Sequence, residues 1–393
     1  MLYVGIDVAS QKHDCCIIDS DGIILNASFT FPNTRDGYNC LFETVVSFLP
    51  DKKVLGVRIG LESTGHYSNN LVSFLLSKNL NITVFNPLQV NLYRKAQSLR
   101  KTKTDKTDAK FLAVMLFSDN SKPYTPVSYR ISELKSLARH RFRLIALRSK
   151  LKISVSRLVT ILFPELSSVV WSVHQKSSYA MLLELPTAKA IANCHLTKLT
   201  NLLNDNSKGK YGKDKALSIK ELAAKSIGSD SVSVGFELQQ TIRLVNNLQE
   251  EINILDGHIK TVMEDIDSPI LTIPGISYTL GAIILAEIGD ITNFVNPAKL
   301  LAFAGLEPST YQSGKYVAGN TPMVKHGSTY LRWALLNAAR LVAMRDATFK
   351  NYYQKKKSEG KHHFVALSHV GKKLVRVVFQ LLKMNTSFVA KTN

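Results

Sequence analysis

The chain has 393 residues, of which 45% are hydrophobic and 20% are charged. This is the composition of a folded globular protein, and it excludes a disordered or low-complexity chain. There are 50 Lys and Arg residues against 30 Asp and Glu residues, a formal net charge of +20. A folded protein this basic usually binds a polyanion, most often a nucleic acid. At about 150 residues per domain, the length predicts two to three domains.

The cellular setting is indicated by three further features. The four cysteines have neither paired metal-binding spacing nor a dense disulfide pattern, which fits a reducing cytoplasm. The N-terminal segment lacks the basic start and apolar core of a signal peptide. The longest apolar stretch, around residues 280–285, is far shorter than the ~20 residues that a membrane span needs. We therefore expect a cytoplasmic, nucleoid-associated protein without a membrane segment.

The N-terminal part alternates between strand and helix patterns. An Asp-Gly pair at residues 21–22 predicts a hairpin turn within residues 15–31. Apolar runs typical of buried strands lie at 2–9, 54–62 and 81–87, and helical spacing is found at 36–49 and 66–79. A hairpin followed by strand–helix units predicts an α/β domain in which a mixed sheet is flanked by helices.

Two long helices are predicted next, over residues 131–163 and 236–266. Leu137, Leu144, Leu151 and Leu158 recur every seven residues in the first helix, and the second has apolar residues spaced alternately by three and four. This spacing predicts a helical coiled-coil arm, which could also act in dimerisation. The polar side of the first helix carries Arg130, Lys135, Arg139, Arg141, Arg143, Arg148, Lys150, Lys152 and Arg157, against one acid, Glu133.

The domain division follows from these patterns. We expect an α/β domain over residues 1–125, an arm with an insertion over 126–268, and a mainly helical domain over 269–393. Between the long helices, the Ser- and Lys-rich segment 204–215 has the composition of an exposed loop. The basic face of the arm, with Arg139, Arg143 and Lys150, is a candidate surface for nucleic acid.

Four acids stand where a soluble core would not need them. Asp7 lies within the first predicted strand, Glu62 ends the second, and Asp105 and Asp108 share one face at the start of a helix. Each acid taken alone is more simply a cap or a strand end. Together they could hold Mg²⁺ or Mn²⁺, because these ions prefer carboxylate oxygens. Basic residues beside them, including Lys101 and Lys103, are candidates for a phosphate track.

The segments GIDVA, LESTG and TDKTDA, which contain the four acids, occur in this order along the chain. They resemble the D-E-D-D pattern of the RuvC-like domain, of RNase H fold, in a family of bacterial insertion-sequence transposases. The segment FNPLQVNLYRKAQSLRKTKTDKTDAKFLA carries most of this resemblance. This family is the DEDD transposases, which are related to the Piv-type DNA invertases. Its members are bridge-RNA-guided recombinases.

The C-terminal part resembles the transposase domain of the same family. The segment around Pro274-Gly275 reads as helix, turn and helix, and such a turn could hold a phosphate through backbone N–H groups or be an ordinary helical hairpin. In this family a loop serine after a G-L-x-P segment is the nucleophile, and Ser313 is the matching residue. The family often has two glycines after the serine, whereas Lys315 follows Gly314 here, so the nearby Ser309 is an alternative nucleophile. Cations suited to stabilising charge on a phosphate are Lys315, Lys325 and Arg332.

The resemblance implies a DNA transposase that recombines element ends with a target through serine–DNA intermediates. It further implies Mg²⁺ at the four acids, a structured guide RNA, and a homo-oligomer, dimer or tetramer, in which the two sites come from different protomers. RNA would be held by its shape and backbone, for which the basic arm and Lys-rich loops are suited.

Three alternatives remain open on the sequence. The first is a nuclease or junction resolvase of the same fold, which would cut with metal-activated water and leave Ser313 without a role. The second is a small-molecule kinase of the actin-like fold, whose second phosphate loop and adenosine loop we do not find. The third is an inactive nucleic-acid-binding protein, which four acids beside a phosphate track disfavour.

Overall fold

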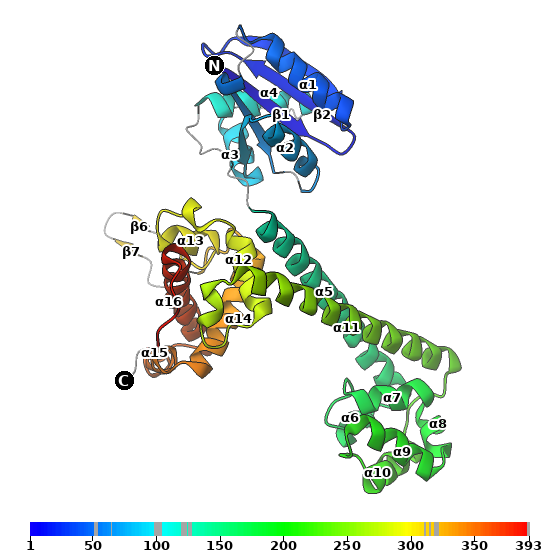
Figure 1. Ribbon diagram of the computed structural model, residues 1–393. Coiled ribbons are helices and arrows are strands. Elements are labelled where there is room, and N and C mark those ends of the chain that lie inside the picture. The colour runs from blue at the N-terminus through cyan, green and yellow to red at the C-terminus, as the bar shows by residue number, and fades with distance from the viewer. Residues whose placement is uncertain are drawn as a thin grey trace. The chain divides into compact units, whose positions relative to one another are not determined.

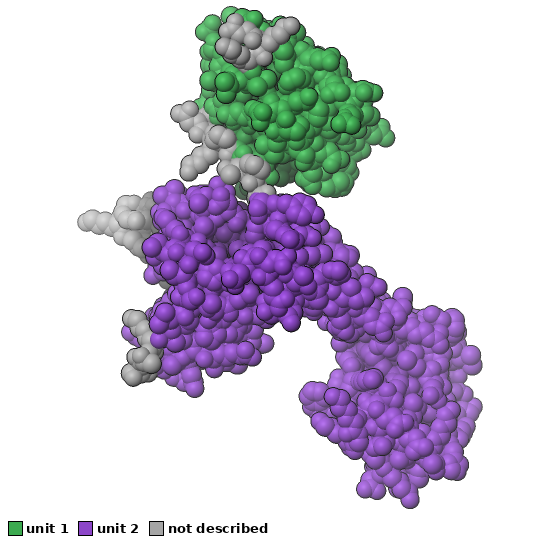
Figure 2. Space-filling view, in the orientation of Figure 1, with its two compact units in different colours: residues 1–126 green, residues 127–393 purple. Residues whose placement is uncertain are grey.

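A computed structural model describes residues 1–50, 54–63, 65–97, 104–118, 124, 128–309 and 322–390, together with the backbone of 312–313 and 316–317. The chain divides into two compact units, Met1–Pro126 (unit 1) and Val127–Asn393 (unit 2) (Figure 2). The expected arm and the expected C-terminal domain both fall within unit 2. The finer division at residue 268 stays a prediction.

Unit 1 contains a five-stranded mixed sheet flanked by helices (Figure 1). Its elements are β1 (Leu2–Val8), β2 (Lys12–Ile18), β3 (Ile24–Pro32), α1 (Arg35–Ser47), η1 (Val54–Gly56), β4 (Val57–Glu62), α2 (Ser68–Ser77), β5 (Asn81–Phe85), α3 (Pro87–Gln97) and α4 (Asp105–Ser118). The strand order is β3-β2-β1-β4-β5. β1, β2 and β3 pair antiparallel, whereas β4 pairs parallel with both β1 and β5. The predicted mixed α/β sheet and its hairpin are confirmed.

Alternating residues of β1 face different helices. Val4, Ile6 and Val8 are buried in a core that also contains apolar side chains of α1 and α2. Gly5 lies on the other face, where α4 packs. This division follows from the period of two along a strand. It places Asp7, two residues after Gly5, on the same face as α4.

Unit 2 is almost entirely helical. Its elements are α5 (Tyr129–Leu162), α6 (Leu166–Val169), α7 (Lys176–Glu184), α8 (Ala188–Asn193), α9 (Leu196–Ser207), α10 (Lys213–Ala224), α11 (Val232–Ile266), η2 (Pro269–Thr272), α12 (Tyr278–Ile288), η3 (Ile291–Asn293), α13 (Pro297–Phe303), β6 (Gln312–Ser313), β7 (Tyr316–Val317), α14 (Thr329–Arg345), α15 (Ala347–Ser358) and α16 (His363–Met384). The two long helices expected from the sequence are α5 and α11. Among the described residues, no helix has the length and apolar character that a membrane crossing requires.

α5 and α11 pack side by side as an antiparallel pair (Figure 1). Their direction is shown by ion pairs that join the start of one helix to the end of the other: Arg130 to Asp265 at 3.1 Å, Arg141 to Asp256 at 2.5 Å, and Arg157 to Glu237 at 2.8 Å. The expected one-sided basic face is therefore partly neutralised by acids of α11. Two helices alone do not enclose the side chains between them, so the predicted seam is only partly buried: Leu158 is buried, whereas Leu137, Leu144 and Leu151 are half-buried.

Two hydrophobic cores stabilise unit 2. One joins the start of α5 and the end of α11 to α12, α14 and α16. The other joins the end of α5 and the start of α11 to the small helices α6–α10, which gather at the far end of the helix pair (Figure 1). The sequence predicts an exposed loop over residues 204–215. The connection is shorter and covers residues 208–212, because α9 continues to Ser207 and α10 begins at Lys213. The segments on both sides of this loop are amphipathic helices, because Leu199 and Leu203 of α9 and Ile219 of α10 are buried.

Candidate functional site

Two parallel neighbouring strands bring the first two candidate acids to one edge of the sheet. Asp7 is half-buried near the end of β1, and Glu62 is the last residue of β4. Ile6 lies opposite Leu61 in the parallel register, so Asp7 and Glu62 occupy the next positions along the two strands. The sequence predicted this arrangement because carboxyl ends of adjacent parallel strands meet at the same edge.

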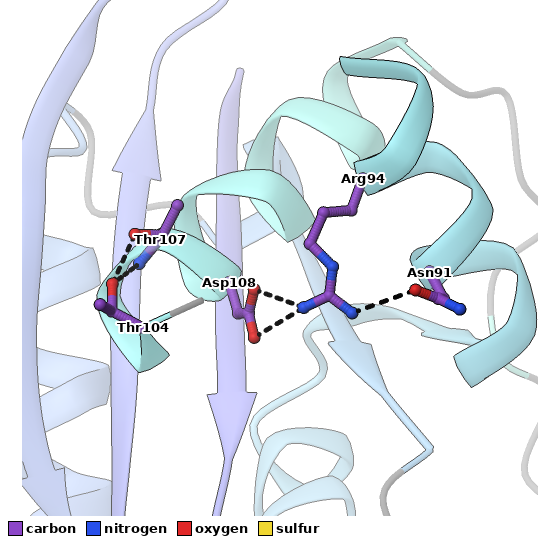
Figure 3. Close-up of polar contacts among 5 residues, drawn as sticks. All are labelled: Asn91, Arg94, Thr104, Thr107 and Asp108. Carbon is purple, nitrogen blue, oxygen red and sulfur yellow. Dashed lines mark hydrogen bonds and ion pairs between the residues drawn. The ribbon is translucent and has the colours of Figure 1, made fainter. Parts of the chain in front are cut away.

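The N-terminus of α4 contributes the other two acids, Asp105 and Asp108, in its first turn. The Thr104 hydroxyl accepts a hydrogen bond from the Thr107 backbone N–H at 3.2 Å, an N-cap interaction that begins the helix before Asp105 (Figure 3). Asp105 is exposed and Asp108 is half-buried. α4 packs on β1, so this turn lies over the strand that carries Asp7.

The acids affect one another's ionisation. The pKa of Asp7 is raised from 3.8 to about 6, first by burial and then by the negative charges of Asp108, Asp105 and Glu62 in that order. Four carboxylates within electrostatic reach of one another repel unless a cation or a proton offsets them. The pKa of Asp7 therefore identifies a region of concentrated negative charge at this edge of the sheet.

A fifth acid in this region was missed by the sequence analysis. Asp14 on β2 lies directly opposite Asp7 in the antiparallel register and is 4% exposed. The Thr30 hydroxyl donates a hydrogen bond to Asp14 Oδ1 at 2.6 Å, and the charge of Asp14 contributes to the raised pKa of Asp7. Its position in a strand that pairs with β1 was the available signal, since directly opposite residues share a face.

Asp108 is held by an arginine of the neighbouring helix. Arg94 Nη1, on α3, donates to Asp108 Oδ1 at 2.9 Å and to Oδ2 at 3.1 Å (Figure 3). Arg94 Nη2 donates to Asn91 Oδ1 at 3.4 Å. This contact fixes the carboxylate of Asp108 and offsets part of its charge.

The donor set suits a hard divalent cation by its chemistry, because it consists of carboxylates whose charges repel one another. The side chains do not converge into a finished metal site, however. Within the described residues, no three His, Cys, Asp or Glu side chains come close enough together to hold a metal ion.

Several predicted residues cannot be placed. Lys101, Lys103 and Lys315 lie outside the described residues. Ser313 lies in β6, which pairs antiparallel with β7 so that Ser313 is opposite Tyr316. Only the backbone of these two short strands is described, so the structure places the position of Ser313 in the chain and not its hydroxyl.

The segments on either side of residues 310–321 are tied to each other. The Ser309 N–H donates to the carbonyl of Pro322 at 2.8 Å, and the Val324 N–H donates to the carbonyl of Glu307 at 3.0 Å. These bonds make the chain segments before and after Ser313 an antiparallel pair. The alternative nucleophile, Ser309, is half-buried and takes part in this pairing through its backbone N–H.

Arg332 supports the same loop. From the first turns of α14, its Nη1 donates to the carbonyl of Lys325 at 3.0 Å and to the carbonyl of Ala304 at 3.4 Å. These contacts join α14 to both sides of the loop base, a role that the sequence did not indicate. Lys325 itself has an exposed side chain.

Arg139 forms an ion pair that the sequence did not predict. Its Nε and Nη2 donate to the two carboxylate oxygens of Glu287 on α12, at 2.7 and 3.1 Å. Glu287 is 5% exposed and also accepts a hydrogen bond at 2.7 Å from Ser328, the N-cap of α14. Burial opposes ionisation of Glu287, but the bonds from Arg139 and Ser328 outweigh it and lower its pKa. Arg139 also lies over the Tyr330 ring at 4.9 Å.

Three predicted nucleic-acid-binding residues remain: Arg143, Lys150 and Gly275. Arg143 and Lys150 are exposed on α5, and among the described residues neither is found in an ion pair. Gly275 has a φ of +100°, and a Cβ atom on it would meet backbone atoms of Leu341 at about 3 Å. Gly275 is therefore needed where the turn before α12 packs against α14.

Comparison with known proteins adds independent information. Residues 4–164, which contain the four acids, match a family model described as "Transposase". Residues 267–354, which contain Gly275, Ser313 and Arg332, match a second family model, "Transposase IS116/IS110/IS902 family". The two matches together cover more than half of the chain.

Two similar proteins match over nearly the whole length, and a third matches over about a third of it. A 44.8 kDa protein of insertion element IS116 from Streptomyces clavuligerus is 27% identical, over 97% of this chain and 94% of its own length. The pilin gene-inverting protein of Moraxella bovis is 24% identical, over 98% and 97%. A 43.6 kDa protein of insertion element IS110 from Streptomyces coelicolor is 29% identical, over 37% and 36%. The chain therefore belongs to the IS116/IS110/IS902 family of transposases, enzymes that recombine DNA.

Proposed function

We propose that unit 1 is a RuvC-like domain of RNase H fold whose four acids act in DNA strand cleavage. The support is the sheet order β3-β2-β1-β4-β5, with an acid on the central β1, an acid at the end of β4 and two acids on α4. The observation that carries the proposal is that β1 and β4 bring Asp7 and Glu62 to one edge of the sheet, where α4 packs on β1. Burial and then the charges of Asp108, Asp105 and Glu62 raise the pKa of Asp7 there. Such mutual repulsion is useful to a protein chiefly where a cation is to be bound.

Mg²⁺, or Mn²⁺ in its place, would be held by Asp7, Glu62, Asp105 and Asp108. When bound, the ion would offset their charge and stabilise negative charge on a phosphodiester. The chain's own contribution is positional. β1 and β4 set Asp7 and Glu62 side by side, and the cap at Thr104 sets the first turn of α4. Arg94 fixes the carboxylate of Asp108 through two hydrogen bonds.

The second part of the proposal is a serine nucleophile. The hydroxyl of Ser313 would attack a phosphorus atom, so that a serine–DNA phosphodiester forms and the P–O bond to one strand end breaks; that end leaves as a hydroxyl that takes up the serine proton. Attack by the hydroxyl of a different strand end on the serine–DNA phosphodiester would then join the two strands and return the proton to Ser313. The paired segments around Ser309 and Pro322, braced by Arg332, would hold the loop that carries Ser313. Exposed Lys325 would stabilise charge on the phosphate oxygens.

The third part concerns partners. The substrate is DNA, as the name of the pilin gene-inverting relative indicates for that protein. We propose that a structured guide RNA selects the sites, as the resemblance to this family implies; the net charge of +20 is compatible with phosphate contacts to both DNA and RNA. We also propose that the α5–α11 pair is a coiled-coil arm and that the protein acts as a homo-oligomer in the cytoplasm.

A covalent-trapping assay tests the chemistry. Purified full-length protein is incubated with element-end DNA, host RNA and Mg²⁺, and is then resolved under denaturing conditions. We expect a protein–DNA adduct that is lost in Ser313→Ala and in Asp7→Asn. The adduct should persist in Ser309→Ala and in Asp36→Asn, a change at an exposed acid of α1 on the opposite face of the sheet.

Two results would contradict parts of the proposal. Cleaved DNA without any adduct would leave the acids as the whole catalytic apparatus and establish the nuclease alternative. An adduct that is lost in Ser309→Ala and kept in Ser313→Ala would move the nucleophile to Ser309.

A further inference from the structure

A cleft of about 570 Å³ lies in unit 2 where the α5–α11 pair meets the small inserted helices. One wall is α11, which presents Val245, Asn246, Gln249, Glu250 and Asn253. Their spacing places them on one face of the helix. The four acids and the two candidate nucleophiles, Ser309 and Ser313, are absent from the lining residues that the structure describes. The cleft therefore has a role separate from the proposed catalytic site.

The opposite wall is α7 and the residues that precede it. Ala180 and Leu183 supply apolar surface, and Lys176 lies at the first turn. His174 is held in place on both ring nitrogens: Nε2 is 3.1 Å from the Ser156 hydroxyl and Nδ1 is 2.9 Å from the Tyr179 hydroxyl. This wall is therefore pre-formed, since the ring cannot turn without losing two hydrogen bonds.

The polar groups of the α11 wall are also ordered. The Arg148 guanidinium donates to Gln249 Oε1, and Gln249 Nε2 donates to Asn253 Oδ1 at 2.8 Å. This relay leaves the Asn253 amide nitrogen as a donor. Glu250 and Asn246 add acceptor and donor groups along the same face. The wall thus offers both donors and acceptors, as recognition of a base edge requires.

Charge in the cleft favours a phosphate-bearing ligand. Lys152 and Lys176 line it against one acid, Glu250. Burial and the nearby charge of Lys152 lower the pKa of His174, so the imidazole is neutral at pH 7 and adds no further charge. The volume is within the range of small-molecule sites and accommodates one nucleotide. Apolar surface for a base face, amides for its edge and lysines for its phosphate are all present.

We propose that this cleft binds a single unpaired nucleotide of the nucleic-acid substrate, with the base between α7 and α11 and the phosphate at Lys152 and Lys176. The inference rests on the proposed function, because it takes the ligand from the nucleic acid on which the enzyme acts. It assigns a role to the inserted helices α6–α10, which build one side of the site. Bases taken out of a stack are bound in this way, by hydrogen bonds to the base edge and by contact with aromatic or apolar side chains.

The test measures binding of the full-length protein to oligonucleotides of about 15 nucleotides by fluorescence anisotropy. Three probes are used: single-stranded RNA, single-stranded DNA of the same sequence, and the duplex DNA. Asn246→Leu replaces an amide of the cleft wall with an apolar side chain of similar size, and Asn247→Leu makes the same change at the exposed neighbour outside the lining. Lys176→Gln is matched by Lys225→Gln, at an exposed lysine of the same inserted region.

We expect Asn246→Leu and Lys176→Gln each to weaken single-strand binding about tenfold, with duplex binding unchanged. The two control variants should stay within about twofold of the unchanged protein. The strand type that is weakened, RNA or DNA, identifies the source of the nucleotide. In the unchanged protein, a 4-thiouridine or 4-thiothymidine probe should cross-link to peptides of α7 or α11, which requires no variant to fold.

Equal single-strand affinities of Asn246→Leu and Asn247→Leu, or cross-links confined to other peptides, would overturn this inference and leave the proposed function standing. Binding of duplex alone would do the same. A protein that binds none of the three probes at low salt would overturn both.

Discussion

A Cβ atom on Gly5 would lie 2.2 Å from the backbone carbonyl oxygen of Ala109 and 2.3 Å from the backbone nitrogen of Ala113. α4 therefore rests with its backbone directly on β1, which only a glycine at position 5 permits. The first turn of α4, with Asp105 and Asp108, is brought over the strand that carries Asp7. The close approach of one helix to one strand thus assembles the acidic region.

Gly5→Ala should lower the free energy of unfolding of unit 1 by about 3 kcal/mol or more, because the new methyl group meets backbone that cannot move aside. Chemical denaturation of the full-length protein measures this change. Gly56→Ala is the matched control, since a Cβ at that position meets nothing within 4 Å. Equal stability of the two variants would show that α4 can shift and that the contact is not decisive.

Mg²⁺ should stabilise the folded protein against heat, because it would offset repulsion among the acids near Asp7. At a concentration about a hundred times its Kd, the ion should add about 2.7 kcal/mol to the free energy of unfolding. Asp7→Asn should remove most of this gain, and Asp36→Asn should retain it. A gain that survives in Asp7→Asn would place the ion elsewhere.

Glu287→Gln should destabilise unit 2 by about 3 kcal/mol at pH 7, because it removes the buried negative charge that pairs with Arg139 and leaves one acceptor oxygen where there were two. The folded-state pKa of Glu287 lies below its ordinary value of 4.5. Its stabilising contribution is therefore complete above that value and is lost as the pH falls through the folded-state pKa. Denaturation between pH 3 and pH 7 should show the wild-type advantage shrinking only in acid.

The control for this pH series is Glu251→Gln, at an exposed residue of α11. The free energy of unfolding of Glu251→Gln should equal that of the wild type at every pH in the series. An advantage over Glu287→Gln that does not change with pH would mean that the carboxylate charge is not the source of the stabilisation.

Arg143→Gln should weaken duplex DNA binding and reduce the slope of log K against log salt by about 0.9, the loss of one phosphate contact. Arg157→Gln removes the same charge from the same helix, but Arg157 is paired with Glu237 and should change the slope less. Titrations at several salt concentrations measure both. Identical slopes for the two variants would show that the arm does not contact phosphate at Arg143.

Arg332→Gln should reduce formation of the serine–DNA adduct while leaving the salt dependence of DNA binding unchanged, because its guanidinium is bonded to the carbonyls of Lys325 and Ala304. Arg340→Gln, at an exposed residue of the same helix, should affect neither. A shallower salt slope in Arg332→Gln would instead mean that Arg332 contacts phosphate, as the sequence analysis expected.

Local patterns determined much of the fold in advance. The Asp-Gly hairpin, the mixed sheet and the two long helices follow from periodicity and turn chemistry, which depend on residues near one another in the chain. The positions of Asp7, Glu62, Asp105 and Asp108 at strand ends and at a helix start were equally local. The resemblance of the chain to a transposase family followed from the same short segments, and the family matches agree with it.

Partners distant in sequence were decided only by the tertiary structure. Arg139 meets Glu287, and Arg141 meets Asp256, across more than a hundred residues, so the basic face of α5 could not be distinguished from a free one in the sequence. Asp14 becomes part of the acidic region through strand register, and the nucleotide-sized cleft exists only where α7 folds against α11. Periodicity records which face of an element is apolar, whereas ion pairs and clefts depend on which faces meet, and that is set when the hydrophobic cores form.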